Sequence, residues 1–282
     1  MRAEVLALLS ALAAASCGTP LMKLPSGPGA PVPPQEAAAA LAQATASCAA
    51  LRTLTAEIAV SGSAGGHRLR GRLSAGVAAP ASARLEAVAP FGAPLFIFVA
   101  TGDDATLLLP RDSRVLRHGR PDAVLDAVAG VPLGAADLEA TLTGCPAPGD
   151  VQGLRARQFG EAWQQVTSAS AGELYLHRSA PGAPWVLTAS VRRADQGRAW
   201  RTEYRDHQNG VPRTIRVTSL ESGESGAGAG RAFDLQLVLS QVETNVPLEP
   251  AAFTIQIPGD AAPISLDELR RSGPMAPRSH DR

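Results

Sequence analysis

The chain has 282 residues, a formal net charge of zero and 4% aromatic residues. Zero net charge gives no electrostatic basis for binding nucleic acid. So few aromatic rings do not supply a stacking surface for bases or sugars. The length suits one large β domain or two small domains.

The N-terminus has the layout of a secretory signal peptide over residues 1–16. An apolar run from Val5 to Ala15 is followed by small residues and then Cys17. The run is too short to cross a hydrocarbon core, which takes about 20 residues. A Cys at this place resembles the bacterial lipobox, although Ala14 stands where that motif prefers Leu. The resemblance implies a lipid anchor on Cys17, and a plain secreted protein or a buried thiol are the alternatives.

Residues 17–33 are rich in Pro and Gly and lack periodicity, which predicts a semi-extended tether. Gly18 follows Cys17, and in proteobacterial lipoproteins Asp at that place is the usual signal for retention. The resemblance therefore implies sorting to the outer membrane, with the protein facing the periplasm. A helix is predicted over residues 34–51, because apolar residues recur there at spacings of three and four.

Alternating residues then predict antiparallel strands that are wet on one face and apolar on the other. The runs are LTAEIAVSG (54–62), RLRGRLS (68–74) and ARLEAV (83–88). In the second run, Arg68, Arg70 and Arg72 share one face. They form either a solvated strand face or a contact for phospholipid or lipopolysaccharide phosphates, which arginine binds bidentately.

The middle of the chain combines an apolar hairpin with a helical insert. Residues 95–99 and 107–109 are apolar on both faces, which predicts a hairpin that is covered on both sides or faces an apolar cavity. A short strand over 113–119 follows. Two helices are predicted over 121–130 and 132–144, with Pro121 at the first start and Gly130 and Gly144 as stops.

The second half of the chain returns to strands. They are predicted near 151–159, 162–168, 172–178, 185–193, 199–206, 211–219 and 232–246, with a flexible loop over 221–230. A mostly flexible tail over 259–282 carries one helical turn at residues 265–271.

Two cysteines remain after the signal peptide, Cys48 and Cys145. In an oxidising compartment an even pair suggests a disulfide, which would close a loop of roughly 100 residues. Two separate buried thiols are the alternative.

Four segments, in their order along residues 34–258, resemble the LolA/LolB-like lipoprotein localisation superfamily, and most of all its outer-membrane receptor LolB. They are LRTLTAEIAVSG (51–62), PFG (90–92), GVPLGAADLEATLTG (130–144) and VETNVPLEPAAFTIQIP (242–258). The resemblance implies an α+β, mainly β fold: an unclosed antiparallel β-barrel whose helices cover an apolar cavity for acyl chains. The candidate cavity residues are Ile58, Val60, Leu73, Leu85, Phe96, Phe98, Leu107, Leu109, Leu125 and Leu138. The alternative is that these side chains form an ordinary packed core.

The receptor in this superfamily also projects an apolar residue from a loop near the membrane. In this chain the loop PFGAPL (90–95) offers Phe91 or Leu95 for that role.

No arrangement of residues predicts catalysis, a metal or a cofactor. The histidines lack metal-ligand spacing, and neither CxxC nor HExxH occurs. Gly223-Glu224-Ser225 begins like a nucleophile elbow, but Ala227 replaces its last Gly and the surroundings resemble a linker.

We therefore expect a non-enzymatic, monomeric lipoprotein of the bacterial envelope. It would bind acyl chains or lipidated proteins and pass them to the outer membrane, with a periplasmic carrier protein as a candidate donor. The alternative is an assembly lipoprotein that uses the same fold as a protein-binding scaffold.

Overall fold

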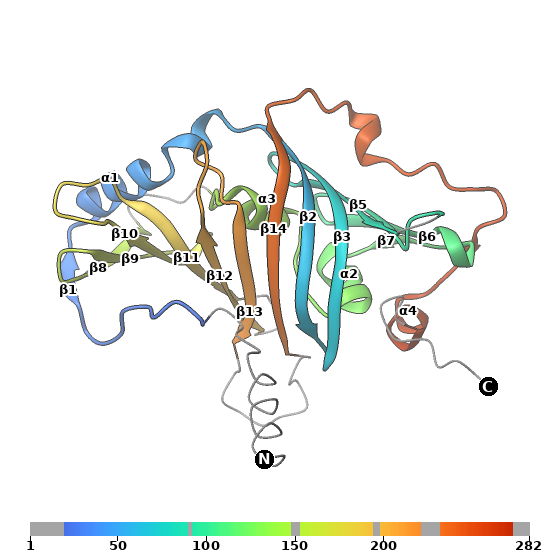
Figure 1. Cartoon of the computed structure of the whole chain (residues 1–282), viewed down its shortest axis with the longest axis horizontal. Helices are drawn as coiled ribbons and strands as arrows, with labels where there is room; N and C mark the ends of the chain where they lie inside the picture. Colours follow the sequence, from blue (N-terminus) through green and yellow to red (C-terminus); the bar gives the residue numbers. More distant parts are fainter. Residues whose placement is uncertain (1–19, 90–91, 148–152, 194–197, 221–231, 273–282) are drawn as a thin grey trace, which may run out of the picture.

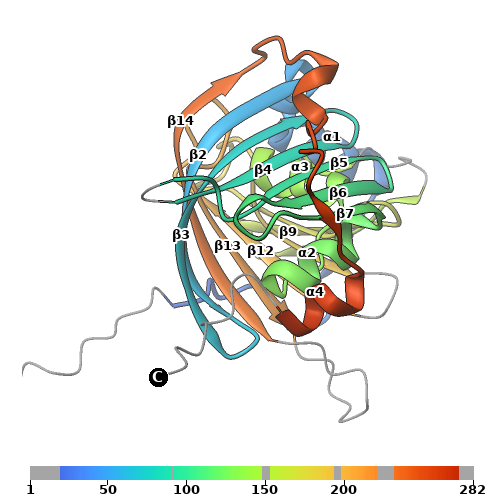
Figure 2. The same ribbon diagram turned by 90° about the vertical axis from the view of Figure 1, so that its right-hand side faces the viewer.

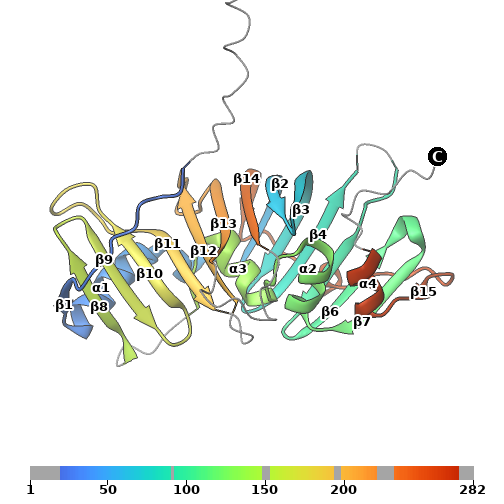
Figure 3. The ribbon, with the colours of Figure 1, turned by 90° about the horizontal axis from the view of Figure 1, so that it is seen from below.

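The computed structural model describes residues 20–89, 92–147, 153–193, 198–220 and 232–272. The named strands form one sheet in the order β1-β8-β9-β10-β11-β12-β13-β14-β2-β3-β4-β5-β6-β7-β15. Seen from below, the strands follow an open arc, and α2 and α3 lie on its inner side (Figure 3). The predicted fold class, mainly β with an unclosed curved sheet, is confirmed.

Two antiparallel runs of strands build the sheet. The first run is β2 (Thr53–Ala64), β3 (His67–Ala78), β4 (Ser82–Val88), β5 (Ile97–Thr101), β6 (Asp104–Leu109) and β7 (Arg114–Gly119). The second is β8 (Arg155–Phe159), β9 (Trp163–Ser168), β10 (Gly172–His177), β11 (Val186–Arg193), β12 (Ala199–Arg205), β13 (Thr214–Leu220) and β14 (Phe233–Thr244). Pairing of β14 with β2 joins the end of the second run to the start of the first (Figure 1).

The alternation read from the sequence assigns the faces of these strands correctly. On β3, Leu69 is buried while the arginines at 68, 70 and 72 are exposed. The hairpin of β5 and β6 is covered on both faces, because Val99 and Leu108 are buried as well as Phe98 and Leu107.

The helices cover the concave face. They are α1 (Pro34–Ala44), α2 (Pro121–Ala129) and α3 (Ala135–Thr143). α1 lies against β8, β10 and β11, α2 against β6, and α3 against β3 and β4. The glycine stops are confirmed, since Gly130 and Gly144 end α2 and α3 with φ of 72° and 70°, a left-handed conformation that suits glycine.

The helix predicted over residues 34–51 is shorter than expected. It ends at Ala44, and a 3-10 helix, η1 (Ala46–Ala50), follows. The hydroxyl of Thr45 donates a hydrogen bond of 2.8 Å to the carbonyl of Leu41 at this break.

The predicted tether also needs correction, because residues 20–29 are docked on the convex face of the sheet (Figure 3). We call them the N-terminal strap. Met22 N–H donates to Glu203 Oε1 over 2.8 Å, and Arg157 donates to the carbonyl of Pro28 over 2.7 Å. The strap leads into a short strand, β1 (Ala30–Val32), which pairs with β8.

Described residues beyond the predicted boundary at residue 258 also pack on the domain. The 3-10 helix η4 (Pro250–Phe253) is held by Arg84, which donates hydrogen bonds of 3.0 Å to the carbonyls of Ala252 and Thr254. Next, β15 (Ala262–Pro263) pairs with β7 in parallel. The last helix, α4 (Leu266–Ser272), lies beside α2 and buries Leu269 (Figure 2).

A further 3-10 helix, η2 (Pro110–Asp112), joins β6 to β7. Within the described ranges, no helix is long and apolar enough to cross a membrane. The predicted signal peptide, Cys17, Phe91 and the loop over 221–230 lie outside these ranges.

Candidate functional site

The candidate cavity residues lie in register on the concave face of the sheet. Leu85 on β4 is opposite Phe98 on β5, and Phe98 is opposite Leu107 on β6. On the neighbouring strands, Ile58 of β2 is opposite Leu73 of β3. This face points toward the helices and forms a continuous apolar surface from β14 to β7.

Most of the candidate residues are packed rather than exposed to a hollow. Phe98 and Leu107 are 0% exposed, and Leu125 of α2 and Leu138 of α3 are buried in the same cluster. Ile58, Leu85, Phe96 and Leu109 are buried there too. At these eight positions the structure therefore matches the alternative of a packed core.

The two remaining candidates mark an apolar opening. Val60 and Leu73 are half-buried, and so is Leu237 of β14. A Cβ atom at Gly71, which is opposite Val60, would meet no atom within 4 Å. We define the apolar opening by Val60, Gly71, Leu73 and Leu237. It lies where β2 and β3 continue past the end of β4, whose last residue, Val88, pairs with Arg72.

The part of the concave face built by β8–β12 differs, because polar groups are buried there. Tyr204 Oη lies 3.4 Å from the carbonyl of Ala140 in α3 and 3.5 Å from Ser190 Oγ. Burial raises the pKa of Tyr204. The hollow between α3 and these strands measures only about 10 Å³.

Ion pairs hold α2 and α3 beside the same strands. Arg192 contacts Asp137 of α3 at 2.9 Å, and Arg198 contacts Asp126 of α2 at 2.7 Å. Both pairs are largely shielded from water, so they fix the helices more firmly than exposed pairs would.

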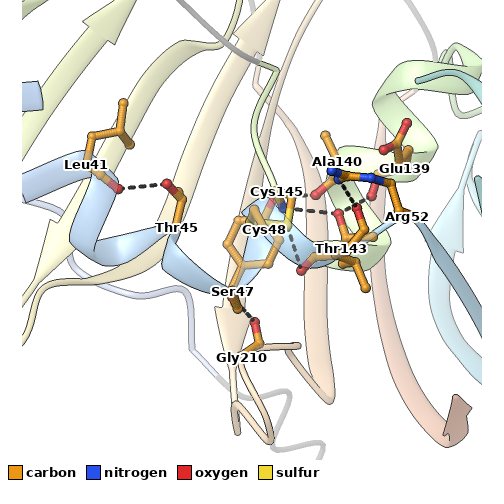
Figure 4. Close-up of a disulfide and its surroundings, with 12 residues drawn as sticks. Leu41, Thr45, Ser47, Cys48, Arg52, Glu139, Ala140, Thr143, Cys145 and Gly210 are labelled. Atoms are coloured by element: carbon orange, nitrogen blue, oxygen red, sulfur yellow. Dashed lines mark hydrogen bonds between the residues drawn. A yellow bond between two sulfur atoms is a disulfide. The ribbon is translucent and has the colours of Figure 1, made fainter. Parts of the chain in front are cut away.

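The predicted disulfide is confirmed and connects two parts of the helical cover. Cys48 in η1 is bonded to Cys145, just after α3, with their Cα atoms 5.5 Å apart (Figure 4). Thr143 Oγ1 accepts a hydrogen bond of 3.1 Å from Cys145 N–H. On the other side of η1, the hydroxyl of Ser47 donates to the carbonyl of Gly210 over 3.4 Å (Figure 4).

On the convex face, the N-terminal strap covers a buried carboxylate. Glu203 is 1% exposed and contacts Arg201 at 2.6 Å and Arg205 at 3.0 Å. The carbonyls of Met22 and Pro20 accept hydrogen bonds from Arg201 and Arg205, respectively. The strap therefore supplies further hydrogen-bond partners to this ionic cluster.

Leu95 does not fit the role of a projecting residue. It is half-buried, packs against the core, and its N–H donates to the carbonyl of Ala87 over 3.0 Å. In the described part of the chain, no group of three or more His, Cys, Asp or Glu residues could hold a metal ion.

The sequence analysis missed Leu237, Gly71 and the buried Glu203. Alternation places Leu237 on one face of β14, but nothing in the sequence says that β14 pairs with β2. Gly71 and Val60 become an opening only because β4 ends early, which depends on the lengths of paired strands. Glu203 resembles any polar residue on a wet strand face until the strap is seen to cover it.

No protein-family model and no curated protein matches this chain. Among solved structures, the chain is similar to a LolA superfamily protein from Nitrosomonas europaea, with a TM-score of 0.48 and 13% identity over 78% of this chain and 97% of that one. A DUF1329 family protein from Desulfovibrio piger gives a TM-score of 0.49 and 13% identity over 77% and 97%. An outer membrane lipoprotein-sorting protein domain from Vibrio parahaemolyticus gives 0.42 and 14% over 77% and 97%.

Proposed function

We propose that this chain is a lipid-anchored envelope protein that binds the acyl chains of lipids or lipidated proteins and passes them to the outer membrane, as the receptor LolB does. The anchor is an acyl group on Cys17, and the protein acts without covalent chemistry. The observation that supports this best is the apolar concave face of β14 and β2–β7, which is partly uncovered at the apolar opening.

The acyl chain would enter at the apolar opening and replace contacts between α2, α3 and the sheet. Burial of each methylene contributes about 0.8 kcal/mol, so a long chain can compensate for separating packed apolar side chains. The apolar contacts that the acyl chain replaces are non-directional. Their replacement leaves no polar group of the protein without a partner. Release into a membrane then follows from relative affinity.

The test uses the full chain with Cys17→Ser, which removes the attached lipid. Native mass spectrometry would detect co-purified lipid, and a fluorescent fatty acid would be titrated and then displaced by an acylated peptide. We expect saturable, displaceable binding. A clean ligand-free mass together with no saturable binding contradicts the proposal.

Two neighbouring substitutions on β2 make the test specific to one face. Val60→Asp puts a carboxylate in the apolar opening, and we expect fatty-acid affinity to fall at least about tenfold because the charge loses water when the acyl chain binds. Ala59→Asp adds the same charge on the exposed convex face and should leave affinity unchanged. Equal effects of the two variants contradict an acyl site at this opening.

A second candidate function is a scaffold for an envelope complex. The complete burial of Phe98 and Leu107 favours it, because a scaffold fills its concave face with its own side chains. A scaffold should bind no fatty acid and should retain protein partners when it is isolated from the envelope.

A further inference from the structure

Three arginines on the convex face lack the partners that other arginines of this protein have. Within the described ranges, Arg68, Arg70 and Arg72 are exposed and form no ion pair, and we call them the arginine row. By contrast, Arg84 pairs with Glu86 and Arg216 with Asp234 on the same face. The carboxylate of Asp234 is so well matched that Arg216 holds its pKa below the usual range.

The surroundings of the arginine row suit an anion. Directly opposite on β2, Ser63 faces Arg68, Ser61 faces Arg70 and Ala59 faces Arg72. The cross-strand neighbour of Arg72 on β4 is Val88, so no residue directly opposite the row carries a carboxylate. The carboxylates of the paired strands on this face, Glu57 and Glu86, are opposite Ser74, beyond the Arg72 end of the row. Residues two apart on a strand are separated by about 7 Å, which makes a linear array of three guanidinium groups.

The arginine row and the N-terminal strap lie on the same, convex face of the sheet. Register pairing runs from Glu203 through Arg216, Gln236 and Ser61 to Arg70, so these residues share one face. Strands lie about 4.8 Å apart, which puts the row roughly 20 Å from the site where Pro20 and Met22 dock. Three residue steps separate Pro20 from Cys17 and span at most about 11 Å.

We propose that the arginine row binds the phosphates of an anionic membrane surface and orients the domain on the bilayer that holds its anchor. This proposal rests on the proposed function only in assuming the lipid anchor at Cys17. Leu69, Gly71 and Leu73 alternate with the arginines on β3, so the apolar opening is on the opposite face of the same hairpin. Docking of the row therefore holds the apolar opening at the level of the headgroups.

Protection of a strand edge is the simpler explanation of the row. Among the described residues, none pairs with β3 on the β4 side before Arg72, and charged residues prevent such edges from pairing with other chains. Reversal of the charge separates the two explanations. Glutamates protect an edge as arginines do, but anionic lipid repels them.

The test measures binding of the full chain with Cys17→Ser to two kinds of vesicle, one of phosphatidylcholine alone and one with about 30% phosphatidylglycerol. For the unaltered row we expect roughly 100-fold tighter binding to the anionic vesicles, lost at high salt, from about fivefold for each basic residue. The combined variant Arg68→Glu, Arg70→Glu and Arg72→Glu should lose this preference. Residues 1–19 are the same in every protein compared, so their own contribution cancels.

A matched control reverses three exposed arginines on three different strands: Arg117 on β7, Arg155 on β8 and Arg193 on β11. It should retain most of the preference for anionic vesicles. Equal losses in both variants mean that net charge alone matters, and no loss in the row variant points to an acidic protein partner or edge protection; either result overturns the proposal. Fatty-acid binding of the row variant should stay unchanged, which separates this proposal from the proposed acyl site.

Discussion

The two halves of the concave face are built from different interactions. The apolar half, β14 with β2–β7, carries only apolar side chains in register toward the helices. The mixed half, β8–β12, faces α1 and α3 with buried polar groups. In the described ranges, the buried polar residues of this face belong to α3 and to β9–β12: Thr141, Thr143, Gln164, Ser168, Ser190 and Thr202. The buried Glu203 lies on the convex face, under the N-terminal strap.

This difference indicates which half can accept a ligand. Hydrogen bonds and ion pairs are directional, so the mixed half has one favourable arrangement, and separating it leaves polar groups without partners. Apolar contacts depend on buried area rather than on direction. Under the proposed function, an acyl chain would therefore replace the helices over the apolar half, while the mixed half would keep the cover attached.

Removal of the disulfide should have the largest effect on stability. The bond joins η1 to the end of α3, the helix that contacts the mixed half. Cys48 and Cys145 are 97 residues apart, and in the chain-entropy model the bond contributes about 4–5 kcal/mol. We expect the double variant Cys48→Ala and Cys145→Ala to lower the free energy of unfolding in denaturant by about this amount. The reduced parent protein should lose as much, and a loss below about 1 kcal/mol in both contradicts the assignment.

Truncation of one large side chain in each half tests the ligand directly. Phe98→Ala in the apolar half and Trp200→Ala in the mixed half should each destabilise the protein by about 3–5 kcal/mol, because both side chains are fully buried. Saturating fatty acid should restore part of the loss for Phe98→Ala alone, since an acyl chain fills the new space. Thermal unfolding with and without fatty acid measures this, and equal recovery in both variants refutes the difference between the halves.

The smallest expected effect is on stability at alkaline pH, and it comes from Tyr175 on the convex face of β10, behind the mixed half. Burial of the Tyr175 phenol, together with Glu173, raises the pKa of Tyr175 to about 12. The unfolded chain loses this proton near pH 10 while the folded protein keeps it, so stability is fully present below about pH 10 and falls as the pH rises toward 12. Tyr175→Phe should reduce this fall in a series of unfolding experiments across that range. An unchanged pH dependence would show that Tyr175 is not responsible.

The fold class could be predicted because the alternation that marks strands is a property of short segments. The faces of β3 and the glycine stops after α2 and α3 follow from local pattern alone. The N-terminal strap could not be predicted, because its backbone atoms make most of its contacts with Arg157, Arg201 and Glu203. Composition describes such a segment as a flexible linker.

The candidate site was predicted in part for a related reason. Apolar patterning identifies the residues of the concave face, but a core and a ligand site share this pattern. Whether Phe98 faces a ligand or the side chains of the helices depends on how closely the helices approach the sheet. That distance follows from long-range contacts such as the disulfide and the Arg192–Asp137 pair.

The two edges of the sheet are short strands, β1 after the N-terminal strap and β15 before α4. β1 has three residues and β15 has two, and each contains a proline, Pro31 or Pro263. Proline cannot donate a backbone hydrogen bond, and short edge strands give an incoming strand little to pair with. The termini therefore prevent the sheet from growing by strand addition, and trimming either one would expose β8 or β7 to self-assembly. With the lipid anchor proposed above, copies of the protein crowded on one membrane would depend on these few residues to stay separate.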